Sequence, residues 1–385
     1  MEDFLNLDQQ YTAAEKTIRD TINAFVTKDF NPLILNAYEK AAFPQQIIPA
    51  LCELNIFGMT LPEEYGGSAA SYIAYGLTCQ ELERGDSGLR SFVSVQSSLC
   101  MQAIYQYGSE EQKKFFLPKM AKGEILGCFG LTEANSGSDP ASMKTTAKKV
   151  NNGWLLSGTK LWITNATLSN LAIVWANTKD GIRGFMVEKN FKGFSSNAIH
   201  HKLSMRASDT GELVFNDCFV PDSHYLEKSD CGIKAPLSCL TQARYGIAWG
   251  VVGVAEACFS LTQEYILARK QFHKPLGAFQ LVQKDLVDMF SEIVKMQCLN
   301  VQIGRLMDEG KATPEHISLA KMNNVRSALN IARQCRNLLG ANGITLEYQV
   351  MRHMLNLETV STYEGTDNVH HLILGKYLTG IDAFG

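Results

Sequence analysis

A single carboxylate near the C-terminus is the clearest candidate for catalysis. Glu364 lies in the short segment 362–366 (sequence TYEGT), which contains Gly365 and separates two stretches with the apolar spacing of helices. A carboxylate at such a break can point into a cavity, where burial disfavours its charged form and raises its pKa toward neutrality. Glu364 is therefore a candidate general base, although a helix-terminal Glu followed by a glycine cap has the same local sequence.

Two polar segments in the middle of the chain contain groups that suit a flat heterocycle or a phosphate. Residues 131–139 (LTEANSGSD) supply hydroxyls, backbone amides and a flexible glycine. Residues 162–165 (WITN) add an aromatic ring and a hydroxyl at the end of an expected strand. Each segment also has an ordinary interpretation, the first as a Ser/Gly-rich loop and the second as a strand with a core tryptophan.

Arg90 is the cation best suited to binding a carboxylate. No charged residue occurs from Ser91 to Ser109, so we expect Arg90 to begin a largely buried helix. A buried guanidinium needs a partner. Asp86, four residues earlier, could form a helical ion pair with it, and Glu83 could lie on the same helix face. The functional alternative is a bidentate bond to a substrate carboxylate.

The other titratable residues give weaker signals. Arg269 follows an apolar helix and could be either a surface cation or a phosphate ligand. The histidines, which include the pairs at 200–201 and 370–371, have no metal-ligand spacing, so we expect structural or surface roles for them. The 10 cysteines are scattered without a Cys-x-x-Cys, which argues against a zinc site and a disulfide framework. Most should be small buried residues in a reducing compartment.

The composition indicates neither a nucleic-acid-binding nor a membrane-inserted protein. The formal net charge is −3, 19% of residues are charged, and no basic tract stands out. The longest apolar run, Tyr245–Ala255, is interrupted by glycines and is too short to span a bilayer. The N-terminus has neither a basic apolar signal nor an Arg-rich transit segment. We expect a cytoplasmic location, or the mitochondrial matrix if a transit segment has been removed.

The order of sequence patterns predicts an α+β fold with three domains in its 385 residues. Residues 1–124 have helical periodicity, residues 125–234 have short apolar runs between turns, and residues 235–385 are helical again. We therefore expect an N-terminal all-α domain, a middle domain of antiparallel strands and a C-terminal helical domain. The clearest strands are 154–156, 171–175 and 213–215, with turns at 151–153, 180–181 and 209–211. Neither a Rossmann glycine motif nor a P-loop occurs.

Five motifs that occur in order make the chain similar to the acyl-CoA dehydrogenase family over nearly its whole length. They are 62–67 (PEEYGG), 131–139, 162–165, Arg269-x-x-Phe272 and 363–366 (YEGT). Within the family, the chain most closely resembles the glutaryl-CoA dehydrogenases, through 88–91 (GLRS), 94–98 (SVQSS), 243–250 (ARYGIAWG) and 374–384. Ala134, Ala341 and the pair Asp367-Asn368 depart from the family pattern. These departures concern the fine geometry around FAD rather than the reaction class.

The resemblance implies an acyl-CoA dehydrogenase-like fold that ends in a four-helix bundle, with bound FAD. It also implies a homotetramer, an acyl-CoA substrate and electron transfer flavoprotein as the electron acceptor. Arg269 and Gln280 match groups that reach the FAD of a neighbouring subunit. The full set of positions that match FAD contacts is Phe129, Leu131, Thr132, Gly137, Ser138, Trp162, Ile163, Thr164, Arg269, Gln280, Thr366 and Phe384.

The resemblance also assigns roles around the substrate. Glu364 matches the base that removes the α-proton. Arg90 and Ser91 match the pair that holds the distal carboxylate in glutaryl members, and Glu83, Arg90 and Tyr363 match a network linked to decarboxylation. The positions that match substrate contacts are Arg90, Ser91, Ser138, Leu237, Thr241, Arg244 and Gly365.

The implied reaction is α,β-dehydrogenation of glutaryl-CoA, in which the β-hydrogen leaves as a hydride to the flavin. Loss of CO2 and reprotonation would then give crotonyl-CoA. Three alternatives remain. The protein could be a non-decarboxylating glutaryl-CoA dehydrogenase, or an acyl-CoA dehydrogenase for an uncharged short or branched chain, in which Arg90 has only protein partners. It could also be a non-enzymatic flavin- or CoA-binding protein, which would not need Glu364.

Overall fold

The N-terminal part of the chain is helical in the structure, a computed structural model that describes residues 3–384. Helix α1 begins with a capping box in which Thr12 and Glu15 bond each other's backbone N–H groups. A second capping box, between Ser109 and Gln112, likewise begins α7. The helices of this part are α1 (Ala13–Phe25), α2 (Asn31–Lys40), α3 (Ile48–Glu53), α4 (Tyr72–Gly85), α5 (Ser87–Ser94), α6 (Gln102–Tyr107) and α7 (Glu110–Ala121).

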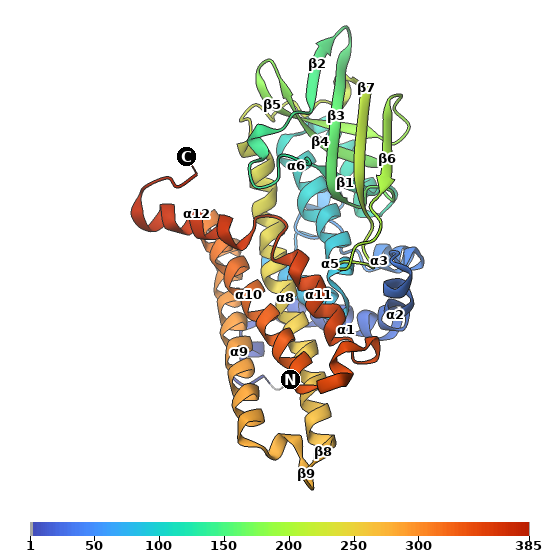
Figure 1. The fold of residues 1–385 in the computed structure, drawn as a ribbon. Coiled ribbons are helices and arrows are strands. Elements are labelled where there is room, and N and C mark those ends of the chain that lie inside the picture. The colour runs from blue at the N-terminus through green and yellow to red at the C-terminus, as the bar shows by residue number, and fades with distance from the viewer. Residues whose placement is uncertain (1–2, 385) are drawn as a thin grey trace.

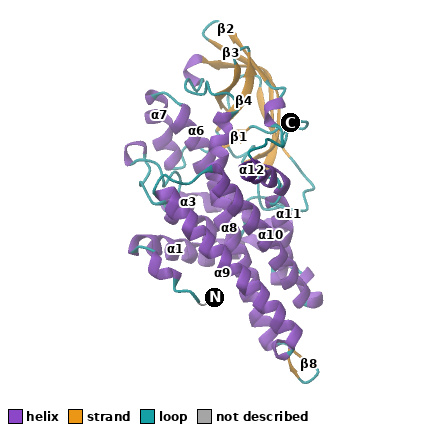
Figure 2. Cartoon of the chain, turned by 90° about the vertical axis from the view of Figure 1, so that its left-hand side faces the viewer, coloured by secondary structure: helices purple, strands orange, loops and turns teal. Residues whose placement is uncertain are grey.

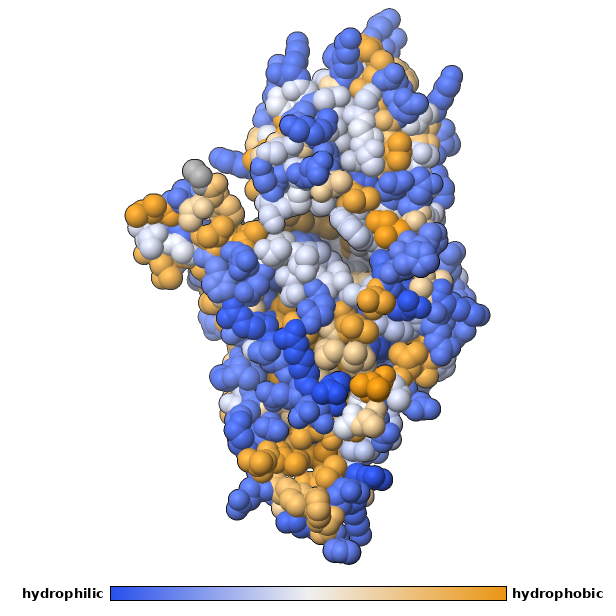
Figure 3. All heavy atoms as spheres, viewed as in Figure 1, coloured by the Kyte–Doolittle hydropathy of each residue, from blue (hydrophilic) through white to orange (hydrophobic). Residues whose placement is uncertain are grey.

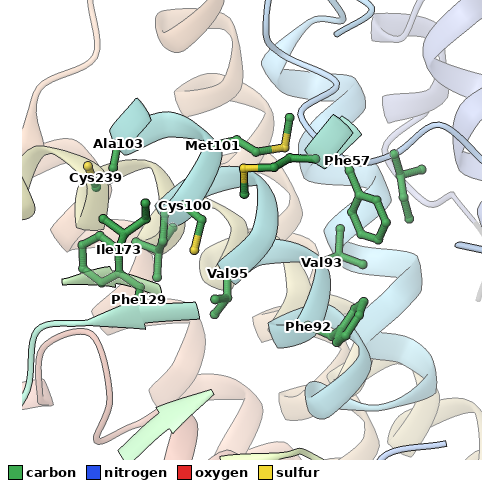
Figure 4. Packing of buried hydrophobic residues seen from close by; sticks show 14 of the residues in the cluster. Phe57, Phe92, Val93, Val95, Cys100, Met101, Ala103, Phe129, Ile173 and Cys239 are labelled. Atoms are coloured by element: carbon green, nitrogen blue, oxygen red, sulfur yellow. The ribbon is translucent and has the colours of Figure 1, made fainter. Parts of the chain in front are cut away.

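A continuous buried segment from α5 to α6 connects this helical part to the sheet. Helix α5 continues through a π-helical stretch, Val95–Met101, in which every side chain is buried. Figure 4 shows side chains of this segment between the helices and the strands. The cluster includes Phe57, Phe92, Val93, Val95, Cys100, Met101, Ala103, Phe129, Ile173 and Cys239. Because α5 packs in this cluster, the residues that it carries have fixed positions.

A twisted sheet forms the middle of the chain and lies at one end of the molecule (Figures 1 and 2). The strand order is β1-β4-β2-β3-β7-β6, with β5 paired to β4. The hairpins expected at 151–153 and 180–181 are present as β2–β3 and β4–β5. The strands are β1 (Gly127–Gly130), β2 (Thr146–Val150), β3 (Gly153–Thr164), β4 (Leu171–Thr178), β5 (Gly181–Glu188), β6 (Phe194–Ala198) and β7 (Thr210–Pro221).

Two details of the sheet differ from the prediction. The sheet is mixed, because β1 and β2 pair parallel with β4 while the other pairs are antiparallel. The turn expected at 209–211 is instead the start of β7. Gly211 pairs there with Ile163 and Ala198, and a Cβ on it would overlap the carbonyl oxygen of Asn197. The glycine permits close approach of two strands rather than a turn.

Long helices form the C-terminal part, as the periodicity predicted. Helices α8, α9, α10 and α11 pack against one another, and α12 extends to the side (Figure 1). Helix α8 continues beyond the apolar run noted in the sequence and is 35 residues long. It is long and apolar enough to cross a membrane, but 83% of its most apolar window is buried in the fold. The elements are α8 (Lys234–Ala268), β8 (Lys270–Gln271), β9 (Lys274–Pro275), α9 (Gln280–Asp308), α10 (Pro314–Leu338), α11 (Val350–Val360) and α12 (Asp367–Thr379).

Candidate active site

Glu364 lies in the predicted break between two helices. Helix α11 ends at Val360, and Thr366 caps α12 by accepting a hydrogen bond from the Val369 N–H at 3.3 Å. Between them, Glu364 has a φ of 52° and Gly365 a φ of 102°. The left-handed region is unfavourable for a residue with a side chain, and such strain is concentrated at functional sites. The local chain conformation thus sets Glu364 apart from an ordinary helix-terminal residue.

The Glu364 carboxyl group has the environment expected of a base. The residue is half-buried, but its Oε2 is inaccessible and has no hydrogen-bond partner within residues 3–384. Burial raises the pKa of this carboxyl, although the nearby charges of Arg90, Lys321 and Arg244 act in the opposite direction. The side chain therefore retains a free oxygen and a proton affinity greater than that of an exposed glutamate.

Arg90 joins α5 to the Glu364 segment. The side chain is fully buried, and its Nε donates to Oε2 of Glu83 at 2.7 Å while its Nη2 donates to the Tyr363 hydroxyl. The Ser91 hydroxyl lies 3.4 Å from the same Tyr363 oxygen. Nη1 of Arg90 and Oε1 of Glu83 have no partner in the described part of the chain. The structure thus brings together the four residues that the sequence assigned to the distal carboxylate and the decarboxylation network.

The helical ion pair between Asp86 and Arg90 is not formed. Asp86 has an extended conformation between α4 and α5, where its Oδ1 caps α5 by accepting from the Gly88 N–H at 2.7 Å. Its Oδ2 pairs with Arg352 and accepts from Asn356 Nδ2 at 2.8 Å. Because the helix is interrupted at Asp86, the four-residue spacing does not place its side chain beside Arg90.

One face of α8 leads to the same segment. Leu237 and Thr241 are half-buried, and Arg244 follows at the spacing of one helix face. Arg244 is buried, and its Nε donates to the Glu364 carbonyl oxygen at 2.6 Å. Gly365 is confined from two sides, since a Cβ on it would lie 3.0 Å from His370 Nε2 and 3.3 Å from Arg244 Nη2. The backbone here can approach a ligand closely only because residue 365 has no side chain.

The polar loop 131–139 is held in place by an ion pair that the sequence analysis missed. Glu133 accepts hydrogen bonds from the backbone N–H groups of Lys144 and Thr145, at 2.6 and 2.9 Å, and from Lys160 Nζ at 2.9 Å. These bonds lower the pKa of Glu133 to about 2 despite its burial. Lys160, fully buried on β3, also donates to the Leu131 carbonyl at 3.0 Å. The loop is therefore anchored rather than flexible, while Gly137 and Ser138 remain exposed.

Trp162 is on the surface and not in the sheet core. Its side chain is 58% exposed, and its φ of 63° coincides with a register irregularity between β3 and β7 from Lys160 to Ile163. A β-bulge of this kind redirects a side chain out of the strand alternation. The Leu161 N–H donates to the Thr132 carbonyl at 2.8 Å, which places the indole next to the polar loop. Ile163 is buried and Thr164 is half-buried.

These groups fit the flavin of FAD. An exposed aromatic ring stands beside a rigid loop that presents hydroxyls and an unobstructed glycine, with nothing within 4 Å of a Cβ built on Gly137. Phe129 on β1 and Leu131 at the start of the loop are buried. Figure 3 shows a hollow in the surface of the molecule between the sheet and the helices. Within residues 3–384, no cluster of His, Cys, Asp or Glu side chains is arranged to hold a metal ion.

Two residues assigned to FAD, Arg269 and Gln280, lie far from this loop within one chain. Arg269 and Gln280 are exposed where β8 and β9 connect α8 to α9, at the end of the molecule opposite the sheet (Figure 1). Phe384 is 53% exposed beyond α12, whereas Thr366 lies close to Glu364 as the cap of that helix. The structure of one chain therefore does not unite Arg269 and Gln280 with Trp162.

Two buried groups near Glu364 were not singled out from the sequence. Lys321 on α10 donates from Nζ to the carbonyl oxygens of Tyr363 at 3.0 Å and Gly365 at 2.6 Å. His370 on α12 is fully buried, and neither ring nitrogen has a hydrogen-bond partner in the described chain. Lys321 appears in sequence as an isolated lysine in a helix with many polar residues, so no motif marks it. The sequence predicted a structural or a surface role for His370, and its burial agrees with a structural role.

Known proteins resemble this chain over its whole length. Models of the N-terminal, middle and C-terminal domains of acyl-CoA dehydrogenases match residues 12–124, 128–218 and 230–379. Two crystal structures of glutaryl-CoA dehydrogenase from Mycobacterium smegmatis, one in complex with FADH2, are 48% and 47% identical to it. Each has a TM-score of 0.97, and the match covers 100% of this chain and 99% of the other.

More distant relatives belong to the same group. The mitochondrial 2-methylacyl-CoA dehydrogenase of Solanum tuberosum is 32% identical over 371 residues, 94% of this chain and 90% of that protein. A chain from a structure described as the electron transferring flavoprotein of Acidaminococcus fermentans is 31% identical, with a TM-score of 0.93 and coverage of 96% and 98%. The exposed indole, the anchored polar loop and the buried carboxyl at the helix break are thus parts of an FAD-dependent dehydrogenase. The chain belongs to the acyl-CoA dehydrogenase family.

Proposed function

We propose that the enzyme oxidises glutaryl-CoA and decarboxylates the product to crotonyl-CoA. The observation that carries this proposal is the state of Arg90. A fully buried guanidinium keeps one nitrogen, Nη1, without a partner among the described residues, and its Nη2 bonds Tyr363 next to Glu364. A buried donor without an acceptor is costly, and a substrate carboxylate would satisfy it. An uncharged acyl chain would leave it unsatisfied.

In the first step, Glu364 removes the α-proton of the thioester. Its raised pKa makes the carboxylate a stronger base than an exposed one, and its Oε2 is free of protein hydrogen bonds. The backbone N–H of Glu364 has no protein acceptor in residues 3–384, so it is available to the thioester oxygen as negative charge develops there. Bound FAD supplies the acceptor for the β-hydrogen.

In the second step, the Glu83–Arg90–Tyr363 network acts on the γ-carboxylate. Glu83 already pairs with Arg90 at 2.7 Å, so Arg90 keeps a buried counter-charge after CO2 has left. Burial raises the pKa of the Tyr363 hydroxyl above its ordinary value, which keeps it protonated as a hydrogen-bond donor. Protonated Glu364 can then return its proton to the dienolate, which gives crotonyl-CoA.

One experiment separates this proposal from its alternatives. The holoenzyme is mixed anaerobically with glutaryl-CoA to follow loss of flavin colour, and then turned over with an artificial acceptor while CO2 and the acyl product are measured. Equal amounts of CO2 and crotonyl-CoA support the proposal. Glutaconyl-CoA without CO2 would indicate a non-decarboxylating enzyme. Efficient bleaching by butyryl-CoA alone would indicate a substrate without a carboxylate.

We also propose that the active form is a homotetramer in which subunits share FAD. This is supported by the position of Arg269 and Gln280 at an exposed end that also presents large apolar side chains, namely Leu267, Phe272 and Leu281. Figure 3 shows apolar atoms gathered at that end of the molecule. We propose electron transfer flavoprotein as the electron acceptor, and the relative from Acidaminococcus fermentans supports it.

A further inference from the structure

The segment that carries Glu364 is held through its backbone by two buried cations. Nζ of Lys321 donates to the carbonyl oxygens of Tyr363 and Gly365, at 3.0 and 2.6 Å. Arg244 Nε donates to the carbonyl oxygen between them, that of Glu364, at 2.6 Å. Three consecutive carbonyls are thus bonded by side chains from α10 and α8 and not by the hydrogen bonds of a helix.

This arrangement addresses a specific difficulty of the site. Glu364 has a φ of 52° and Gly365 a φ of 102°, so both residues depart from helical geometry. A non-glycine residue keeps such a conformation only when its surroundings determine it. Lys321 bonds the peptide groups on both sides of Glu364, and it is only 1% exposed, so water does not compete for these bonds. An ammonium donor also makes stronger hydrogen bonds than a neutral one.

We infer that Lys321 is a positioning residue for the reaction, which holds the backbone on both sides of Glu364 so that its carboxylate faces the substrate. The inference rests on the proposed role of Glu364 as the base. Lys321 would make no contact with substrate or flavin. It would act through its hydrogen bonds to the backbone and through its charge.

The charge of Lys321 is coupled to that of Glu364. Burial lowers the pKa of Lys321 to about 7, and the positive charges of Arg244 on α8 and Arg90 on α5 contribute in the same direction. Glu364 and Asp367 oppose this effect. His370 on α12 also faces this region, but burial lowers its pKa to about 3, so it adds no charge near neutral pH. Below about pH 7, where Lys321 is charged, removing the ammonium should therefore raise the pKa of Glu364 further.

The test compares three variants of the holoenzyme. Lys321→Met removes both the charge and the hydrogen bonds, and Lys321→Gln removes the charge while keeping a donor. Ser318→Ala is the matched control, because Ser318 is buried on the same helix and its hydroxyl has no partner in the described chain. Flavin reduction is measured anaerobically from pH 5.5 to 9 with saturating glutaryl-CoA and, separately, butyryl-CoA. FAD content is measured for each variant.

On the acidic side of the pH–rate profile, the apparent pKa should rise by about one unit or more in both Lys321 variants, as expected when a nearby opposite charge is lost. The maximal rate should fall about tenfold or more in Lys321→Met and less in Lys321→Gln. Ser318→Ala should match wild type. An unchanged apparent pKa in Lys321→Gln overturns the inference, even if Lys321→Met does not fold. Oxidation of butyryl-CoA needs the same removal of an α-proton. If wild type is reduced by butyryl-CoA but not by glutaryl-CoA, the proposed substrate is wrong, while the role of Lys321 can still be tested with butyryl-CoA.

Discussion

Nη2 of Arg90 donates a hydrogen bond to the hydroxyl of Tyr363, a residue 273 positions away in the chain. This bond connects the two ends of the proposed substrate site. Arg90 is where a distal carboxylate would bind, and Tyr363 immediately precedes the proposed base. If either side chain moves, the other loses this hydrogen bond or moves with it. Substitutions at Arg90 should therefore affect proton removal by Glu364 as well as binding of the substrate carboxylate.

Glu364→Gln should retain the fold and FAD but nearly abolish flavin reduction. The amide preserves the shape of the side chain and removes the base, which should slow the reductive half-reaction by roughly 10²–10⁴-fold or more. Stopped-flow measurement of flavin bleaching by glutaryl-CoA checks this, with FAD content as the control. Near-normal reduction would mean that another group removes the proton.

Arg90→Gln should reduce catalytic efficiency with glutaryl-CoA much more than with butyryl-CoA. The substitution also leaves Glu83 as an unpaired buried anion, which typically costs about 3–5 kcal/mol. The double variant Glu83→Gln/Arg90→Gln removes both charges and is the appropriate control for this loss of stability. The measured quantity is the ratio of kcat/KM for the two substrates. If this ratio equals that of wild type in both variants, Arg90 is a structural residue only.

Gly250→Ala should disturb the same network from α8. A Cβ on Gly250 would overlap Oε2 of Glu83, so Glu83 must move away from Arg90. We expect at least a tenfold loss of kcat/KM with glutaryl-CoA, together with a lower melting temperature. Gly375→Ala in α12 is the control, since nothing lies within 4 Å of its Cβ position. There, alanine should stabilise the helix by up to about 1 kcal/mol. Equal behaviour of the two variants would contradict the prediction.

Arg269→Gln should weaken FAD retention without altering the isolated chain's fold. Arg269 is exposed at the end of α8, and in the proposed tetramer it contacts a neighbour's FAD. Sedimentation of wild type should give a tetramer, and the variant should lose FAD on dilution or gel filtration. The adjacent exposed residue provides the control variant Lys270→Gln, which should keep its FAD. A fully loaded, active wild-type monomer would reject the shared site.

His370→Gln should make the stability of the protein less sensitive to acid. Burial lowers the pKa of His370 from 6.5 to about 3, so between these values the unfolded chain binds a proton that the folded chain does not. Stability is therefore lost as pH falls below about 6.5, by up to about 1.4 kcal/mol per pH unit. Urea unfolding at pH 7 and 5 measures the difference. His200→Gln, at an exposed position, is the matched control variant.

Local patterns predicted the elements and their order because helix and strand periodicity depends on near neighbours. The capping box at Ser109, the strand at 171–175 and the break at Glu364 all follow from residues close in sequence. The local sequence also marked Glu364 as a candidate base, but it did not separate that role from a helix-terminal Glu followed by a glycine cap. The family resemblance favoured the base.

Long-range pairings could not be inferred in this way. Asp86 forms its ion pair with Arg352, which is 266 residues away in the chain, and not with the nearby Arg90. The parallel pairing of β1 with β4 depends on the crossover between them. Trp162 leaves the core only because of a bulge against β7, and a lone Lys321 acquires its role only when α10 packs beside Glu364.

The left-handed backbone at Trp162 and Glu364 has an evolutionary consequence. Both residues have a large side chain at a φ near +60°, a conformation that costs less free energy for glycine or asparagine. Selection for thermal stability alone should therefore favour glycine at these two positions. The resulting protein should have a higher melting temperature but no activity. In a deep mutational scan, positions 162 and 364 should be recognisable as those where abundance and activity rank the substitutions in opposite orders.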